Sequence, residues 1–155
     1  MNKSPEIFYD GWLLQDAGYG IAQYADRLLR LLMKSPWADR IRVVTGPGNS
    51  RTLGVPRIEL KSLPLWPKLF REVAWYSRLS KFVQTQKPGS LLILPSPGMM
   101  LRYPPKTVVT CHDLIYRRFP RYLGRWGYRK ILFDWRDRRL ADAMVARYAE
   151  PAAAA

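Results

Sequence analysis

Short apolar runs alternate along the chain with longer segments of helical periodicity. Strands are predicted at residues 7–9, 41–45, 57–60, 91–94, 107–111 and 143–146. The runs at 91–94 and 107–111 are continuously apolar, which is typical of strands buried on both faces of a parallel sheet.

Three segments between these runs predict helices. Apolar residues recur at helical spacing from Ile21 to Leu32, and Ser35-Pro36 ends the pattern. Further helices are predicted at 68–86 and between Gly124 and Leu140.

Strands that alternate with helices predict an α/β fold, a doubly wound parallel sheet of Rossmann-like type with strand order 3-2-1-4-5-6. Ligands of such sheets bind beyond the carboxyl ends of the strands, near the point where the strand order reverses. The loops expected to form a site are therefore residues 10–20, 95–105 and 111–120.

Length and composition indicate one globular domain with a strongly basic surface. We expect a domain over residues 1–148 and an unpacked tail at 149–155. Twenty-six Lys and Arg against twelve acidic residues give a net charge of +14, which attracts phosphates, nucleic acid or an acidic membrane surface.

The single cysteine, Cys111, excludes an intrachain disulfide and favours a reducing compartment. The first residues contain no apolar run of signal-peptide or membrane-spanning length, so we expect a cytoplasmic protein, soluble or peripheral at a membrane.

A glycine-containing loop, Gly18-Tyr19-Gly20, precedes the first predicted helix. Glycines let the backbone approach a ligand closely, and the free N–H groups of a helix start favour an anion. The loop is not a complete dinucleotide-binding fingerprint, because Gln23 stands where a third glycine is needed and no acid follows Thr45. Its two interpretations are a phosphate-facing loop and a plain tight turn.

The only histidine, His112, falls at the end of the fifth predicted strand and is followed by Asp113. An imidazole there can bind a sugar hydroxyl or share a proton near neutral pH. The alternative is a structural histidine held by the backbone. One His, one Cys and scattered carboxylates do not supply a ligand set, so no metal is expected.

Two segments combine basic and aromatic residues. Residues 117–139 hold nine Lys and Arg against two Asp, a difference of seven and thus half of the net charge. This stretch would bind saccharide, nucleic acid or an anionic membrane surface, or form a solvated helix face. Residues 63–76 either lie in a membrane interface or contribute their aromatic rings to the core.

Four segments, in the matching order, resemble the N-terminal domain of retaining GT-B-fold glycosyltransferases of family 4. Residues 20–29 resemble the "G-I-G-R-Y…N-L" start of the first helix, although Ala22 and Gln23 replace the usual Gly and Arg. Residues 108–120 are similar to the "V-V-T-x-H-D-L-I…P" signature, and residues 94–98 occupy the place of an "H-x-P" loop. Residues 139–146 resemble "R-A-D-x-I-I-A-V-S", the last strand before a second domain.

The resemblance implies transfer of a sugar, with retention, from a nucleotide sugar to a saccharide or lipid-linked acceptor. It implies that His112 contacts the donor sugar, so His112 and Asp113 are the candidate catalytic residues. The candidate substrate-binding residues are Gly18, Tyr19, Gly20, Tyr24, Ser96, Arg117 and Arg118. It also implies a C-terminal donor-binding domain, or a partner subunit, that residues 1–155 do not include. Residues 1–155 alone are therefore expected to be inactive, and no cofactor besides the donor substrate is expected.

A basic nucleic-acid-binding module is the alternative from another functional class. It accounts for the net charge of +14 but gives no role to the glycine loop or to the His112-Asp113 pair. The sequence contains no recognised nucleic-acid-binding motif, so a nucleic-acid partner is disfavoured. A small nicotinamide-nucleotide-binding domain is a third interpretation, which the incomplete fingerprint disfavours.

Overall fold

The computed structural model describes residues 5–15, 20–47, 54–61, 68–97, 100 and 103–110. All of them lie in Met1–His112, the first of two units into which the chain divides. The second unit is Asp113–Ala155. The expected single domain over 1–148 stays a prediction.

Strands and helices alternate through the described residues, as the apolar pattern predicts. The strands are β1 (Ile7–Asp10), β2 (Ile41–Thr45), β3 (Arg57–Glu59), β4 (Leu91–Leu94) and β5 (Thr107–Val109). The α-helices are α1 (Gly20–Leu32) and α2 (Lys68–Gln84), and the short 3-10 helices are η1 (Trp12–Gln15) and η2 (Ala38–Arg40). The loop expected after β1 thus contains a helical turn, η1.

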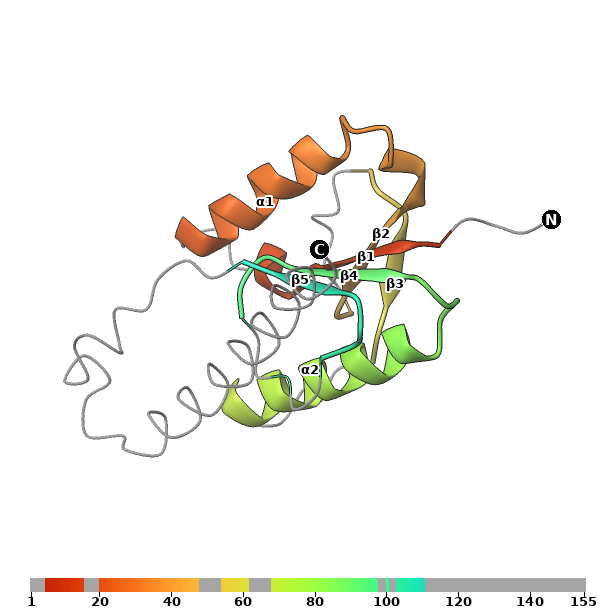
Figure 1. Ribbon diagram of the computed structural model, residues 1–155. Helices are drawn as coiled ribbons and strands as arrows, with labels where there is room; N and C mark the ends of the chain where they lie inside the picture. The colour runs from red at the N-terminus through yellow and green to blue at the C-terminus, as the bar shows by residue number, and fades with distance from the viewer. Residues whose placement is uncertain are drawn as a thin grey trace, which may run out of the picture. The chain divides into compact units, whose positions relative to one another are not determined.

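The sheet is parallel throughout, with the order β3-β2-β1-β4-β5. This arrangement confirms the predicted α/β, Rossmann-like fold. The chain builds one side of the sheet from β1 to β3 and the other side with β4 and β5, so the strand order reverses between β1 and β4 (Figure 1). The sixth predicted strand, at 143–146, lies outside the described residues.

The two α-helices cover opposite faces of the sheet (Figure 1). Successive side chains of a strand point to opposite faces, and β1 shows this directly. The Tyr9 hydroxyl donates to the Ala25 carbonyl oxygen of α1 at 2.7 Å. The Phe8 ring packs edge-on against Phe82 of α2, with ring centroids 5.3 Å apart. Each helix is therefore held to β1 by a specific contact.

An apolar cluster of described residues lies between the sheet and α1. Its buried members come from four strands or their flanks, from η1 and from α1. They are Ile7, Tyr9, Leu14, Ala25, Leu29, Ile41, Val43, Val55 and Ile93. The bounds of α1 agree with the predicted segment, but its buried residues are Ala22, Ala25 and Leu29, whereas Ile21 and Leu31 of the predicted apolar stripe are exposed.

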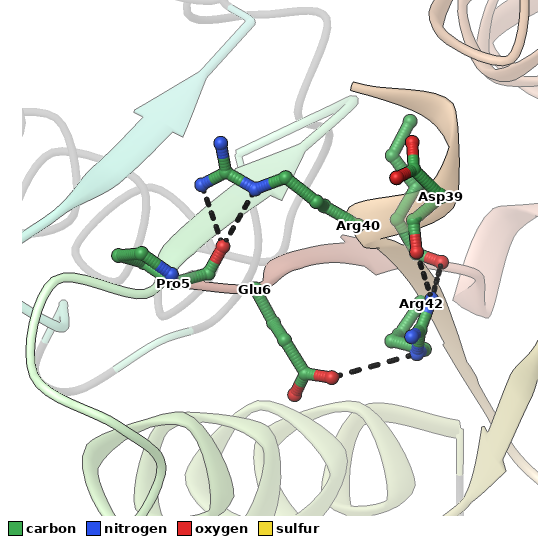
Figure 2. Close-up of polar contacts among 6 residues, drawn as sticks. Pro5, Glu6, Asp39, Arg40 and Arg42 are labelled. Carbon is green, nitrogen blue, oxygen red and sulfur yellow. Dashed lines mark hydrogen bonds and ion pairs between the residues drawn. The ribbon is translucent and has the colours of Figure 1, made fainter. Parts of the chain in front are cut away.

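A group of polar contacts holds the amino end of β1 (Figure 2). Arg40 donates to the Pro5 carbonyl oxygen from Nε at 2.9 Å and from Nη2 at 2.6 Å. Arg42 Nε lies 3.6 Å from a Glu6 carboxylate oxygen, and Arg42 Nη1 donates to the Asp39 carbonyl oxygen at 2.7 Å. These contacts join the start of β1 to η2 and β2, at the edge opposite the one where ligands are expected.

Strand β5 differs from its prediction. It ends at Val109 rather than Cys111, and Val108 is 50% exposed while Thr107 and Val109 are half-buried. The prediction of burial on both faces is wrong here, because β5 is the last strand of the described sheet. The prediction holds for β4, whose Leu92 and Leu94 are fully buried.

The aromatic residues at 63–76 were expected either in the core or in a membrane interface, and the burial of two of them in α2 distinguishes these interpretations. Trp75 and Tyr76 are each only 2% exposed, which confirms the core interpretation for these two side chains. The side chains of residues 62–70 lie outside the described part of the chain. No helix among the described residues combines the length and the apolar character needed to cross a membrane.

Candidate functional site

The carboxyl ends of the parallel strands form the edge where a site is expected. The chain leaves β1 there into η1, and α1 begins at the same edge because it runs antiparallel to the strands (Figure 1). Two groups of polar contacts lie at this edge. One joins α1 to the residue that follows β5, and the other surrounds the last residue of β1.

The first group centres on Tyr24 and Thr110. The Tyr24 hydroxyl and Thr110 Oγ1 form a hydrogen bond at 3.2 Å between residues 86 positions apart. The Thr110 backbone N–H also donates to the Leu94 carbonyl oxygen at 3.0 Å, which extends the hydrogen bonding of β5 to β4 by one residue. Thr110 is therefore held from both α1 and β4, two positions before His112 in the chain.

Three of the predicted site residues are described. Tyr24 forms the contact above, Gly20 is the exposed first residue of α1, and Ser96 is half-buried in the bend after β4. A Cβ added at Gly20 would meet nothing within 4 Å, so the described residues do not require a glycine there. Among the described residues, no hydrogen bond connects Ser96 with Tyr24 or Gly20.

The other predicted site residues lie outside the described part of the chain. They are His112, Asp113, Gly18, Tyr19, Arg117 and Arg118. The basic stretch at 117–139 lies outside it as well.

The second group centres on Asp10, the fully buried last residue of β1. Its Oδ1 accepts two hydrogen bonds, from the Trp12 backbone N–H at 3.1 Å and from the Trp75 indole Nε1–H at 3.0 Å. Its other oxygen, Oδ2, is also buried. A carboxyl group whose Oδ1 accepts two hydrogen bonds is therefore enclosed at the end of the central strand.

Burial raises the pKa of Asp10 to about 6, because the charged form loses its hydration. Hydrogen bonding from Trp12, Trp75 and the Tyr76 hydroxyl acts in the opposite direction, and the nearby negative charge of Glu72 raises the pKa further. Burial and the Asp10 charge likewise hold the pKa of Tyr76 well above its usual value. Asp10 thus changes charge in weakly acidic solution, well above the usual range of an aspartate.

Two tryptophan rings lie beside this carboxyl group. Trp12 and Trp75 have ring centroids 5.2 Å apart and planes tilted by 30°. Trp75 is buried, whereas part of Trp12 is exposed. Asp10 bonds to the backbone of one residue and to the ring of the other, so it holds the pair in a defined arrangement.

Gly11 allows β1 to end close against β2. Its N–H donates to the Val44 carbonyl oxygen at 2.8 Å. A Cβ at this position would lie 2.8 Å from Thr45 Cγ2, 2.8 Å from Val43 Cγ1 and 2.9 Å from the same carbonyl oxygen. Any side chain at Gly11 would therefore displace the end of β1, together with Asp10 and Trp12 on either side.

In the sequence, Asp10 belongs to a loop expected at the site, but its pattern indicates no particular role. The available signal was an acidic residue directly after a short apolar strand, at the strand end where ligands bind. The partner Trp75 gave no such signal, because it is 65 residues away and its pattern allowed both a core and an interfacial position.

Within the described part of the chain, no group of three His, Cys, Asp or Glu residues could hold a metal ion. Comparisons of the chain with protein-family models, with curated proteins and with solved structures give no match.

Proposed function

We propose that the chain is the acceptor-side half of a retaining GT-B-type glycosyltransferase. It acts with a donor-binding domain to transfer a sugar from a nucleotide sugar to a saccharide or lipid-linked acceptor. The parallel sheet and its strand order agree with such a domain. The fold alone hosts many activities, so the argument for this one rests on the segments that resemble the family.

The observation that carries the proposal is the hydrogen bond between Tyr24 and Thr110. Tyr24 belongs to the segment that resembles the start of the family's first helix, and Thr110 to the segment that contains His112. The two segments are far apart in the sequence but are bonded to each other at the carboxyl edge of the sheet. Two segments that form one site must lie close together, whereas two segments that resemble the family by chance need not.

The proposed roles follow from the chemistry of each group. His112 hydrogen-bonds the transferred sugar and shares a proton with a reacting hydroxyl, and Asp113 orients the ligand. The loop of Gly18, Tyr19 and Gly20 presents backbone N–H groups to a phosphate, aided by the positive end of α1. Arg117 and Arg118 bind the anionic part of the donor or acceptor.

The proposed site of action is the cytoplasmic face of a membrane. A net charge of +14 favours an anionic lipid surface, where each basic side chain contributes about 1 kcal/mol of attraction. The concentration of this charge in residues 117–139 makes that stretch the proposed contact with the membrane.

The direct test is sugar transfer by the complete enzyme, with its donor domain. His112→Ala is expected to lower turnover about 100-fold or more while the protein stays folded. Trp37→Ala, which removes an exposed ring near the other end of α1, is the control and should keep the wild-type rate. Near-wild-type turnover by His112→Ala would remove His112 from the site.

A second test uses residues 1–155 without a donor domain. Transfer gains its rate advantage only when donor and acceptor are held together, so this protein should transfer no sugar. Its affinity for nucleotide sugars should be about millimolar, since a few backbone hydrogen bonds barely offset the entropy of association. Calorimetry with a panel of nucleotide sugars measures this. Micromolar binding of any of them would contradict a separate donor domain, and salt-dependent binding of random-sequence DNA instead would favour the nucleic-acid alternative.

A further inference from the structure

We propose that Trp12 is a stacking platform for the apolar face of a sugar ring and that Asp10 is the residue that positions it. This inference rests on the proposed function, because it names the part of the edge that holds the saccharide. It assigns a role to a group of contacts that the family resemblance does not include.

The position of Trp12 is the first argument. It follows directly after β1, the strand next to the point where the strand order reverses, and ligands of open parallel sheets bind beyond this edge. Its side chain is half-buried, so it is packed on one part and open to solvent on another. Trp75 is 2% exposed, so within this pair Trp12 is the ring that a ligand reaches.

The rigidity of Trp12 is the second argument. Its backbone N–H is bonded to Asp10 Oδ1 at 3.1 Å, and its ring lies against the Trp75 ring at 5.2 Å. Trp75 is bonded to the same oxygen at 3.0 Å. One carboxylate oxygen therefore restrains both the backbone of Trp12 and the ring on which it packs. A platform that is already in place loses little conformational entropy when a ligand binds.

The energetics of Asp10 are the third argument. A fully buried carboxyl group loses its hydration, which is unfavourable for the folded state. Groups of this kind concentrate where a geometry is needed for function. The geometry that Asp10 imposes is that of the tryptophan pair.

The chemistry of the ligand follows from the ring. The C–H groups on one face of a pyranose form an apolar surface that stacks on an aromatic face, while its hydroxyls stay at the rim to hydrogen-bond polar groups. Such stacking depends on the shape of the apolar face of the sugar and does not require a charge on the ligand. The ligand class is therefore a neutral pyranoside, as in a saccharide acceptor, rather than the nucleotide of a donor.

The experiment is saturation-transfer NMR on the full chain. The probes are methyl β-D-glucopyranoside, methyl β-D-galactopyranoside and methyl α-D-mannopyranoside, at millimolar concentration. At least one of them should receive saturation, strongest at the ring protons of a single face. Trp12→Ala should reduce this signal at least fivefold, and Trp12→Phe, which keeps a ring, should retain part of it.

Trp37→Ala is the matched control, because Trp37 is another solvent-accessible tryptophan, 53% exposed, away from the edge in question. It should leave the signal unchanged. No saturation of any probe by the wild-type chain, an unchanged signal in folded Trp12→Ala, or an equal loss in Trp37→Ala would each overturn the platform.

A pH profile separates positioning by Asp10 from a merely structural role. Protonation weakens the bonds that its carboxylate accepts, so the wild-type signal should fall severalfold between pH 7.5 and pH 5. Asp10→Asn should give a flat profile over the same range. Among the described residues, the titratable groups that interact with Asp10 are Glu72 and Tyr76 of α2 and Tyr9 of β1, and Tyr103 acts on Tyr76. Glu72→Gln should therefore keep the pH dependence, and a parallel profile in Asp10→Asn would exclude Asp10 as the positioning residue.

These measurements need neither a donor domain nor transfer. If saturation depends on Trp12 but the complete enzyme transfers no sugar, the saccharide-binding site stands and the proposed function is rejected. If the complete enzyme with Trp12→Ala transfers sugar at the full rate with an unchanged acceptor KM, the proposed function stands and the stacking role of Trp12 is rejected.

Discussion

The Trp75 indole nitrogen donates to Asp10 at 3.0 Å, and thereby joins the interior of α2 to the last residue of β1. Both side chains are buried, so water does not compete for this bond. The bond carries more weight when Asp10 is ionised, since hydrogen bonds to charged acceptors are stronger than those between neutral groups. This contact should therefore contribute more to the stability of the domain when Asp10 is ionised than when it is protonated.

Asp10→Asn should change how stability varies with pH. The pKa of Asp10 is about 6 in the folded protein against 3.8 for an ordinary aspartate, so between these values the folded state binds more protons than the unfolded state. Its contribution to stability is complete below the lower value and is lost as the pH rises through the upper one. The difference in unfolding free energy, wild type minus Asp10→Asn, should fall by about 2 kcal/mol from pH 4.5 to pH 7.5.

Urea denaturation of both proteins at several pH values provides the measurement. Other carboxyl groups titrate alike in the two proteins, so they cancel in the difference. A difference that stays constant over this range would show that Asp10 has an ordinary pKa in the folded state.

Trp75→Phe should destabilise the protein more at pH 7.5 than at pH 4.5. The substitution removes the Nε1–H donor to Asp10 but keeps an aromatic ring in the core. Loss of a hydrogen bond to a charged group costs about 1.5–3 kcal/mol, and this part of the effect shrinks once Asp10 is protonated. Trp12→Phe is the control, because Trp12 donates to Asp10 from its backbone N–H. Its destabilisation should be the same at both pH values, and equal pH dependence in the two variants would contradict the assignment.

Much of the fold could be predicted from local patterns. The buried runs of β2 and β4 and the apolar stripe of α1 depend on residues close together in the sequence. The exposure of β5 was not predictable from its own residues, because Thr107 to Val109 resemble a central strand in sequence, whereas among the described residues β5 pairs with β4 alone.

The candidate site was predictable in part for the same reason. The edge follows from the order of strands and helices, and Tyr24 follows from the resemblance. The contacts of Asp10 and Tyr24 were not predictable, because they join residues 65 and 86 positions apart. Such pairings depend on how each helix is seated on the sheet, which periodicity does not specify.

The contact between Tyr24 and Thr110 should be measurable as a coupling energy. Tyr24→Phe removes the hydroxyl and Thr110→Val removes Oγ1, and each change keeps the shape of the side chain. A half-buried hydrogen bond of this kind contributes about 0.5–1.5 kcal/mol, so the two variants should be coupled by about this amount in a double-mutant cycle. Gln23→Ala, at an exposed position of the same helix, should show no coupling to Thr110→Val. Strict additivity of the Tyr24 and Thr110 variants would mean that the bond contributes nothing to the link between α1 and β5.

Gly11→Ala should destabilise the domain, whereas Gly20→Ala should not. The added methyl group at Gly11 would lie 2.8 Å from the methyl groups of both Val43 and Thr45. These side chains are buried and β-branched, so they have few alternative rotamers. The third close atom, the Val44 carbonyl oxygen, belongs to the backbone and accepts the Gly11 hydrogen bond. The strand end must therefore move, at a cost of about 1–3 kcal/mol.

At Gly20 the same methyl group meets nothing within 4 Å, and alanine restricts the unfolded chain, so Gly20→Ala should stabilise the protein by about 0.4–1 kcal/mol. Urea denaturation at neutral pH compares the two variants, and near-ultraviolet circular dichroism reports on the tryptophan pair. Because Gly11 stands between Asp10 and Trp12, its substitution should also alter the dichroism of the Trp12 and Trp75 rings, while Gly20→Ala should leave that spectrum unchanged. A Gly11→Ala protein with wild-type stability and spectrum would show that β2 gives way without moving the end of β1, and Trp12 would then not depend on the close approach of the two strands.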